Sequence, residues 1–318
     1  MGHKYLCILL LLCGAAGCGS PAGKNRQETT ATSSDSVKVS FRLPDIPAIL
    51  ESPEERIDYL SRHFWDNFNF EDSTFLQNPE MIEQAFVDFL DVLTHAPVEK
   101  GQKALIALMN SASVNNGMFL HFINLTEKYL YDPNSPVRNE EFYISVLNTI
   151  IDSSRLDDTF KVRPRYQLRM ALKNRPGNVA ADFRYTLSTG AVARMSSIKA
   201  DYTILFFNNP DCHDCERVKN YIRDSKVFNL LTRIGSMPSL RILAVYPDAD
   251  IALWKKHKAE YPPLMINSFD AGQVITNQEL YDLKAIPTFY LLDKEKRVVL
   301  KDAPVERIEE WLEINLGN

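Results

Sequence analysis

The sequence predicts an all-helical domain over residues 41–174, followed by an α/β domain over residues 175–318. The first range carries apolar residues at helical spacing, in runs that open on proline and acidic residues. The second range alternates short apolar strands with helical patterns, which predicts a mixed sheet flanked by helices. A length of 318 residues suits two domains.

The N-terminal residues predict export and a membrane tether. Lys4 and a short apolar run resemble a signal peptide, and the small residues 15–17 precede Cys18 as in a bacterial lipoprotein signal. We expect residues 1–17 to be removed and Cys18 to be lipidated, although an ordinary secretory signal with an incidental cysteine is an alternative. Residues 18–40 are polar and predict a flexible tether. The expected location is the cell envelope, on an exported lipoprotein that faces the periplasm.

The charge balance excludes one class of partner. The 36 basic and 41 acidic residues give a net charge of −5, and no basic stripe is present, so we expect no nucleic acid partner. Electrostatic binding to anionic lipid is not expected either, so membrane attachment depends on the lipid at Cys18.

The helical domain contains six amphipathic runs, which we expect over 53–68, 79–93, 97–109, 116–130, 137–151 and 163–173. Aromatic residues at helical spacing are typical of a bundle core, so we assign these to the core and not to a ligand groove: Phe64, Trp65, Phe68, Phe70, Phe86 and Phe89. The histidines show no metal-ligand spacing. Nothing in this domain predicts catalysis.

The α/β domain begins with a hairpin within residues 177–195. Continuous apolar runs then predict buried strands over 202–207 and 240–246, and two more strands close the sheet around a four-residue turn. The remaining patterns predict helices after residue 212, over 250–260, 278–283 and 305–316.

A C-x-x-C pair stands where the first buried strand meets its helix. Three of the five cysteines fall within the first 18 residues, so Cys212 and Cys215 are the only thiols left for the folded part. The N-terminal dipole of a helix favours a thiolate at this position. In an oxidising compartment the pair would sit as a disulfide unless an external thiol donated electrons. The pair therefore predicts a redox site.

The loop Asn208-Asn209-Pro210-Asp211-Cys212-His213-Asp214-Cys215, together with Ala285-Ile286-Pro287-Thr288, resembles the thioredoxin superfamily. Ala181-Asp182-Phe183 and Phe269-Asp270-Ala271-Gly272 are similar to motifs of its TlpA/ResA-type membrane-anchored thiol–disulfide oxidoreductases. The resemblance covers about residues 175–318. The helical domain resembles an uncharacterised module that precedes thioredoxin-like domains in exported bacterial lipoproteins.

The resemblance implies a role for each motif residue. Cys212 would be the nucleophile and Cys215 the resolving thiol, with no metal and no cofactor. A cis Pro287 would bind the substrate together with its neighbours Ile286 and Thr288. The active-site loop would contribute Pro210, Asp211, His213 and Asp214.

Three positions depart from the family pattern. Asp211 replaces the usual tryptophan before the first cysteine, and Phe206 and Val218 stand where relatives carry an acid. The usual proton acceptor for Cys215 is therefore missing, and Glu216 is one candidate replacement.

Two functions from different classes remain open. The first is a tethered thiol–disulfide oxidoreductase that exchanges disulfides with cysteine-containing client proteins, and Ile286 favours reduction over oxidation. The second is a non-catalytic binding or scaffold lipoprotein with a static disulfide on the same frame. A metal chaperone is a weaker third, because no distant histidine completes a site around Cys212 and Cys215.

Overall fold

The computed structural model describes residues 40–233 and 238–316. The predicted signal peptide, the lipidation site Cys18 and nearly all of the predicted tether lie outside these residues. One compact unit, Val39–Asn318, contains both the helical segment (residues 40–174) and the α/β segment (residues 175–316). Within the described ranges, no helix is long and apolar enough to cross a membrane.

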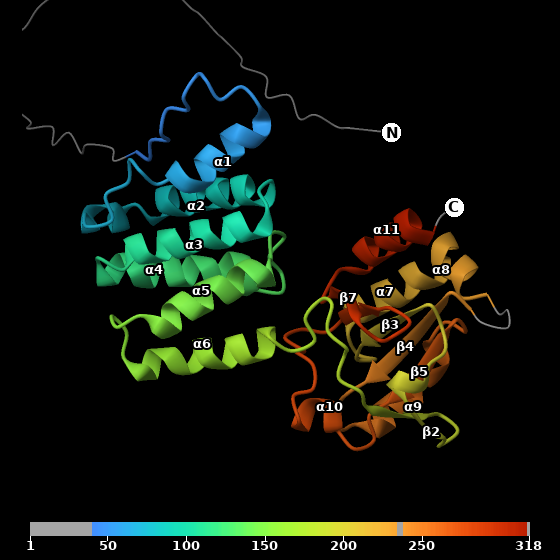
Figure 1. Ribbon diagram of the computed structural model, residues 1–318. Helices are drawn as coiled ribbons and strands as arrows, with labels where there is room; N and C mark the ends of the chain where they lie inside the picture. Colours follow the sequence, from blue (N-terminus) through green and yellow to red (C-terminus); the bar gives the residue numbers. More distant parts are fainter. Residues whose placement is uncertain (1–39, 234–237, 317–318) are drawn as a thin grey trace, which may run out of the picture. The chain divides into compact units, whose positions relative to one another are not determined.

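Among the described residues, six α-helices build the helical segment, and Figure 1 shows α2 to α6 stacked one upon the next. A π-helical turn, Glu127–Tyr131, continues α4 to the end that we expected for it. The helices are α1 Pro53–His63, α2 Pro79–Thr94, α3 Val98–Ala112, α4 Asn116–Thr126, α5 Glu140–Asp152 and α6 Asp158–Ala171.

The two terminal helices differ from the expected bounds. Ser52 and Glu55 form a capping box that starts α1, but α1 ends at His63 and not at Phe68. Beyond it the backbone forms four-residue turns, with the Phe68 N–H donating to the Trp65 carbonyl at 2.9 Å. Helix α6 starts five residues earlier than expected, because Pro164 lies inside it and not in its first turn.

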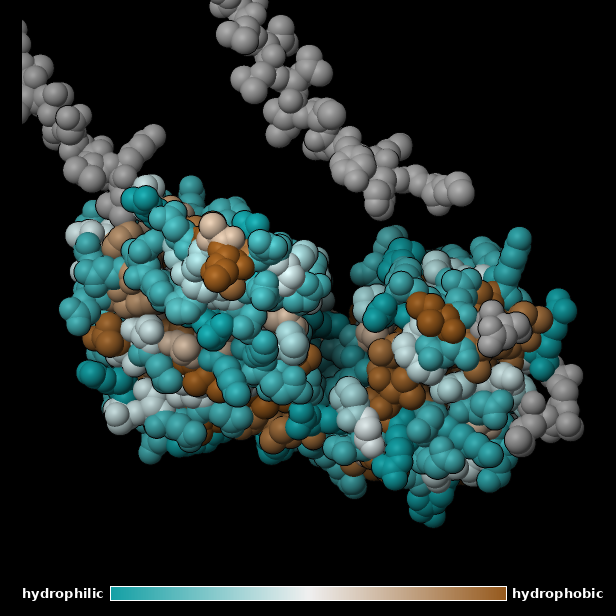
Figure 2. Space-filling view, turned by 45° about the horizontal axis from the view of Figure 1, so that its top comes forward, coloured by the Kyte–Doolittle hydropathy of each residue, from teal (hydrophilic) through white to brown (hydrophobic). Residues whose placement is uncertain are grey.

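The aromatic residues of the helical segment form its core, as expected. The six aromatic residues assigned to the core are at most 9% exposed. The rings of Trp65 and Phe122 lie perpendicular at 5.3 Å between centroids, and Phe122 also contacts Phe86 at 6.0 Å. Figure 2 shows that hydrophobic residues on the visible surface form only scattered patches, so the apolar groups of this segment are mostly inside.

A seven-stranded mixed sheet forms the centre of the described α/β segment, in the order β2-β1-β5-β4-β3-β6-β7. Strands β3, β4 and β5 are parallel, and the other pairs are antiparallel. The strands are β1 Arg184–Leu187, β2 Val192–Arg194, β3 Tyr202–Phe207, β4 Leu240–Tyr246, β5 Met265–Phe269, β6 Thr288–Leu292 and β7 Val298–Lys301.

Both faces of the sheet are covered, which confirms the expected fold class. On one face, Ile204 and Phe206 of β3 pack under α7 His213–Asp224, α8 Lys226–Leu231 and α11 Val305–Leu316. On the other face, Leu205 and Phe207 pack against Phe183, Tyr281 and Ile275. Figure 1 shows α7, α8 and α11 together on one side of the strands. Helix α9, Ile251–His257, packs Trp254 against Tyr246 and Phe269, the last residues of the inner strands β4 and β5.

Three expectations for the α/β segment were wrong or incomplete. Strand β5 was not expected, because its sequence MINSF is short and polar in the middle. One helix was expected after Cys212, but Ser225 ends α7 and caps α8 by accepting the Phe228 N–H at 3.1 Å. The helix expected over 278–283 is instead α10 Val274–Asn277, and the following chain turns at Glu279, whose φ is +47°.

Ion pairs join the two segments next to the strands that carry the site. The carboxylate of Glu140, at the start of α5, lies 2.6 Å from the Lys301 ammonium and 3.2 Å from that of Lys284. Arg138 pairs with Asp302 at 3.1 Å. Burial lowers the pKa of Lys301 and raises that of Asp302. These pairs connect the helical segment to β7 and to the loop before β6.

Candidate active site

The two cysteines lie at the start of α7, directly after β3. Cys212 is the N-cap residue, and its sulfur accepts a hydrogen bond from the Cys215 N–H at 3.2 Å. Both thiols are free, with Cys212 half-buried and Cys215 fully buried. Burial, and then the hydrogen bond with Cys212, raise the pKa of the Cys215 thiol. The outer thiol is therefore accessible, while the inner thiol is held as a neutral group.

The loop before β6 faces the outer thiol. The peptide bond between Ile286 and Pro287 is cis, as the resemblance implied. The Cys212 thiol donates to the Ile286 carbonyl at 3.5 Å, and the Thr288 hydroxyl donates to the Ala285 carbonyl at 2.5 Å. The structure thus brings together residues that are 74 positions apart in sequence.

The other loop residues are mostly at the surface. Pro210 is buried, whereas Asp211, His213 and Asp214 are exposed. The Asp211 N–H donates to the Asn209 side chain at 3.0 Å, which shapes the turn into α7. Within the described ranges the His213 side chain makes no hydrogen bond, so its expected effect on the Cys212 thiolate stays a prediction.

A groove of about 250 Å³ runs beside Pro287. Asp214 and Arg217 of α7 line one part of it, and Pro133 and Asn134 of the helical segment line another. The helical segment therefore forms one wall of the surface that surrounds the reactive pair, a feature that the sequence analysis missed.

A buried lysine stands behind Cys215, and the sequence analysis also missed it. Phe206 and Val218, which replace the acids of relatives, are buried in the apolar core. Lys219 is only 3% exposed, four residues after Cys215 and on the same face of α7. That spacing was the signal that could have identified it, because residues four apart are neighbours on a helix.

Lys219 belongs to a polar cluster under the site. Its ammonium lies 4.9 Å from the centre of the Tyr261 ring and 3.7 Å from the Glu260 carboxylate. The Tyr261 hydroxyl donates to the side chain of Asn208, the first residue of the active-site loop. Burial, and then the charge of Cys215, raise the pKa of Tyr261. The cluster therefore places a cation and a phenol close to the inner thiol.

No metal site accompanies this arrangement in the part of the chain that the structure describes, where no three His, Cys, Asp or Glu side chains gather suitably.

Comparison with known structures decides the family. A thioredoxin-like protein from Bacteroides caccae, solved as a crystal structure, is 44% identical, with a TM-score of 0.84. The match covers 87% of this chain and 99% of that one. The chain belongs to the thioredoxin-like proteins. Residues 17–174 match a domain of unknown function, DUF5106, which confirms that an uncharacterised module precedes the thioredoxin-like part.

Other solved structures match less than half of the chain. The C-terminal domain of an uncharacterized protein from Bacteroides fragilis is 42% identical, with a TM-score of 0.42, and covers 44% of this thioredoxin-like chain and 97% of its own. The thioredoxin domain of a thiol-disulfide oxidoreductase from Bacteroides vulgatus is 20% identical, with a TM-score of 0.38, over 44% of this chain and 96% of that one. No curated protein matches the chain.

Proposed function

We propose that this thioredoxin-like protein is a thiol–disulfide oxidoreductase that exchanges disulfides with cysteine-containing client proteins. One observation carries the proposal. A half-buried thiol at a helix N-terminus, Cys212, contacts the cis Ile286–Pro287 loop and has a fully buried partner thiol, Cys215, behind it. An accessible thiol with an enclosed partner is the arrangement that two-step disulfide exchange requires.

The exchange proceeds in two steps. The Cys212 thiolate attacks one sulfur of a client disulfide, forms a mixed disulfide and releases the other client sulfur as a thiolate that takes up a proton. Cys215 then loses its proton and attacks the Cys212 sulfur. The Cys212–Cys215 bond forms, the bond to the client breaks, and the second client thiolate is protonated. The client gains two electrons, which an external thiol later restores to the protein.

Lys219 would assist the second step. The pKa of Cys215 is raised by burial, so its thiolate needs stabilisation, and the family's usual acid is absent. A cation one helical turn away lowers the free energy of that thiolate. The positive charge of Lys219, held in place by Glu260 and Tyr261, would thus stabilise the Cys215 thiolate by charge alone, a role different from the proton acceptance of the missing acid.

The test is disulfide exchange with a model peptide, using residues 19–318, which contain the compact unit and only two cysteines. We expect Cys212→Ser to reduce the rate to the uncatalysed level, a loss of at least about a thousandfold. Cys215→Ser should accumulate a mixed disulfide that mass spectrometry detects on Cys212. A Cys212→Ser variant as active as the parent would leave the binding or scaffold lipoprotein as the better account.

We also infer that the protein works in the cell envelope, attached to the membrane through lipid on Cys18 and facing the periplasm. The support is the small-residue sequence before Cys18. Cys18→Ser should move the protein from the membrane fraction to the soluble fraction. An unchanged distribution would contradict the lipid anchor and leave the exchange chemistry unaffected.

A further inference from the structure

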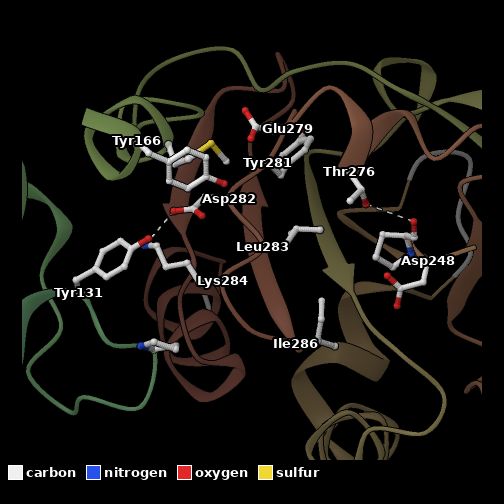
Figure 3. Close-up of a pocket in the computed structure, with 13 residues that line it drawn as sticks. Tyr131, Tyr166, Asp248, Thr276, Glu279, Tyr281, Asp282, Leu283, Lys284 and Ile286 are labelled. Atoms are coloured by element: carbon white, nitrogen blue, oxygen red, sulfur yellow. Dashed lines mark hydrogen bonds and ion pairs between the residues drawn. The ribbon is translucent and has the colours of Figure 1, made fainter. Parts of the chain in front are cut away.

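The loop between α10 and β6, residues 278–287, brings its far end to the reactive pair. The Ile286 carbonyl accepts the hydrogen bond from the Cys212 thiol at 3.5 Å. Figure 3 shows this loop where it lines a cavity of about 430 Å³, with Tyr131 and Tyr166 of the helical segment along one side. The loop therefore lies between the site and the helical segment.

Backbone pairing does not hold this loop in place. Pairing of β6 with β3 begins at Thr288, and within the described ranges residues 281–286 make no backbone–backbone hydrogen bond. The contacts that remain come from side chains, such as the Tyr281 hydroxyl, which donates to the Ala181 carbonyl at 2.6 Å. The position of the loop therefore depends on where its side chains are anchored.

One of these side chains, Lys284, is anchored on the helical segment. Its ammonium lies 3.2 Å from the Glu140 carboxylate and 3.1 Å from that of Asp282, and 4.4 Å from the centre of the Tyr131 ring. The Lys284 side chain is only 8% exposed, and Figure 3 shows it extending from the loop towards Tyr131. Lys284 precedes Ile286 by two residues, so this contact fixes the part of the loop that reaches Cys212.

The partner of Lys284 is itself held firmly. Glu140 lies in the first turn of α5, which Asn139 caps by accepting the Phe142 N–H at 3.1 Å. The Glu140 carboxylate also contacts the Lys301 ammonium at 2.6 Å, and this ammonium donates to two backbone carbonyls near the end of α6, at 2.7 and 2.6 Å. Glu140 is thus a fixed point on the helical segment.

The contact between Glu140 and Lys284 is better suited to fixing geometry than to stabilising the fold. Buried ion pairs contribute little net stability, because the loss of hydration offsets their attraction. Asp282, on the same loop, already supplies Lys284 with a carboxylate. The additional contact with Glu140 therefore determines where the loop lies relative to α5.

We propose that Glu140 and Lys284 are positioning residues, which hold the Ile286–Pro287 loop in the geometry that client exchange needs. The inference rests on the proposed function. A client peptide must lie against this loop while its sulfur meets Cys212, so a displaced loop slows the exchange. A small aromatic disulfide reaches the half-buried Cys212 sulfur without using the loop. The helical segment thereby acts on the reaction without contacting the sulfur atoms.

The test compares two substrates of the reduced protein, residues 19–318. One is a disulfide-linked model peptide, and the other is dithiobis-nitrobenzoate. Glu140→Gln leaves Lys284 paired with Asp282, and Lys284→Met keeps the aliphatic stem against Tyr131. Each variant should lower the second-order rate constant for the peptide by about three- to thirtyfold. The rate constant for dithiobis-nitrobenzoate should stay at the parent value.

Glu141→Gln is the matched control. Glu141 is the next residue of α5 and is also ion-paired, but its partner Arg175 lies outside the loop before β6. This variant should leave both rate constants unchanged. The double variant Glu140→Gln/Lys284→Met should lose no more than the larger single loss, because both substitutions break the same contact.

The outcomes separate this inference from the proposed function. A parental peptide rate in both single variants would overturn the positioning role and leave disulfide exchange in place. An equal fall for both substrates would also overturn it, because the pair would then support the fold and not the loop alone. Losses that add in the double variant would show that the two residues act separately. If the parent reacted with the peptide no faster than Cys212→Ser, both proposals would be wrong.

Discussion

The buried core of the helical segment and the buried cluster behind Cys215 differ in chemistry. The first is built from aromatic rings that contact one another, such as Trp65 and Phe122. The second encloses polar groups in an otherwise apolar setting, namely Lys219, Tyr261 and Asn208. Contacts between buried rings stabilise the fold, whereas enclosed charged groups contribute little to stability and are expected where chemistry needs them. The difference teaches that the interior beside the reactive thiols encloses a charged side chain, which the aromatic core around Phe122 does not.

The largest expected effect tests the aromatic core. Phe122 is fully buried and contacts several rings, so Phe122→Ala should lower the free energy of unfolding by about 3–5 kcal/mol. Urea unfolding measures this. The exposed Phe160 is the control, and Phe160→Ala should change the free energy by less than about 0.5 kcal/mol. Equal losses for the two variants would contradict the packing described for this core.

A substitution in the polar cluster behind Cys215 should slow the exchange reaction and leave the stability of the fold intact. Lys219→Met keeps the aliphatic stem and removes the charge, so the free energy of unfolding should stay the same or rise. The second step of exchange should slow by about tenfold near neutral pH, and its pH–rate profile should move to higher pH. Decay of the trapped mixed disulfide, followed by rapid quench across pH, gives both quantities.

The control for that variant is Lys226→Met, at the exposed start of α8. It should alter neither stability nor the profile. If Lys219→Met destabilised the protein without moving the pH–rate profile, the lysine would be a structural residue. The difference drawn between the aromatic core and the cluster behind Cys215 would then be wrong.

The smallest expected effect concerns pH and the helical core. Burial lowers the pKa of His121 below 6.5, although Glu83 partly opposes this. Between pH 6.5 and the lower pKa of His121 in the folded protein, the unfolded chain therefore binds a proton that the folded protein does not. Stability is intact above pH 6.5 and falls as the pH decreases through this window. Urea unfolding at pH 5.5 and 7.5 should show a smaller drop for His121→Gln than for the parent, and an equal drop would contradict the assignment.

Patterns among residues that are neighbours in sequence were sufficient to predict much of the fold. Strands β3 and β4 are continuous apolar runs, and their bounds match the expected ones. Strand β5 lacks such a run and depends on pairing with β4 and β1, which no local pattern contains. The bend at Ser225 was missed because α8 continues the apolar pattern of α7 after one capping residue.

The site was predictable only in part, for a related reason. Cys212, Cys215 and the Ile286–Pro287 loop belong to motifs that are contiguous in sequence, so their meeting could be expected. Lys219 looks like an ordinary helix residue until Tyr261 and Glu260 enclose it from another part of the chain. The cavity beside Ile286 requires the packing of Tyr131 and Tyr166 against residues more than 80 positions later, which sequence patterns do not contain.

The most direct test of the redox assignment is a titration of residues 19–318 in glutathione and dithiothreitol buffers, with free thiols counted by mass. The account predicts a reversible two-electron transition of the folded protein between the Cys212–Cys215 disulfide and the dithiol. A midpoint near or below about −250 mV would fit a reducing role, and one near about −120 mV an oxidising role. A disulfide that resists reduction until the protein unfolds would contradict the account.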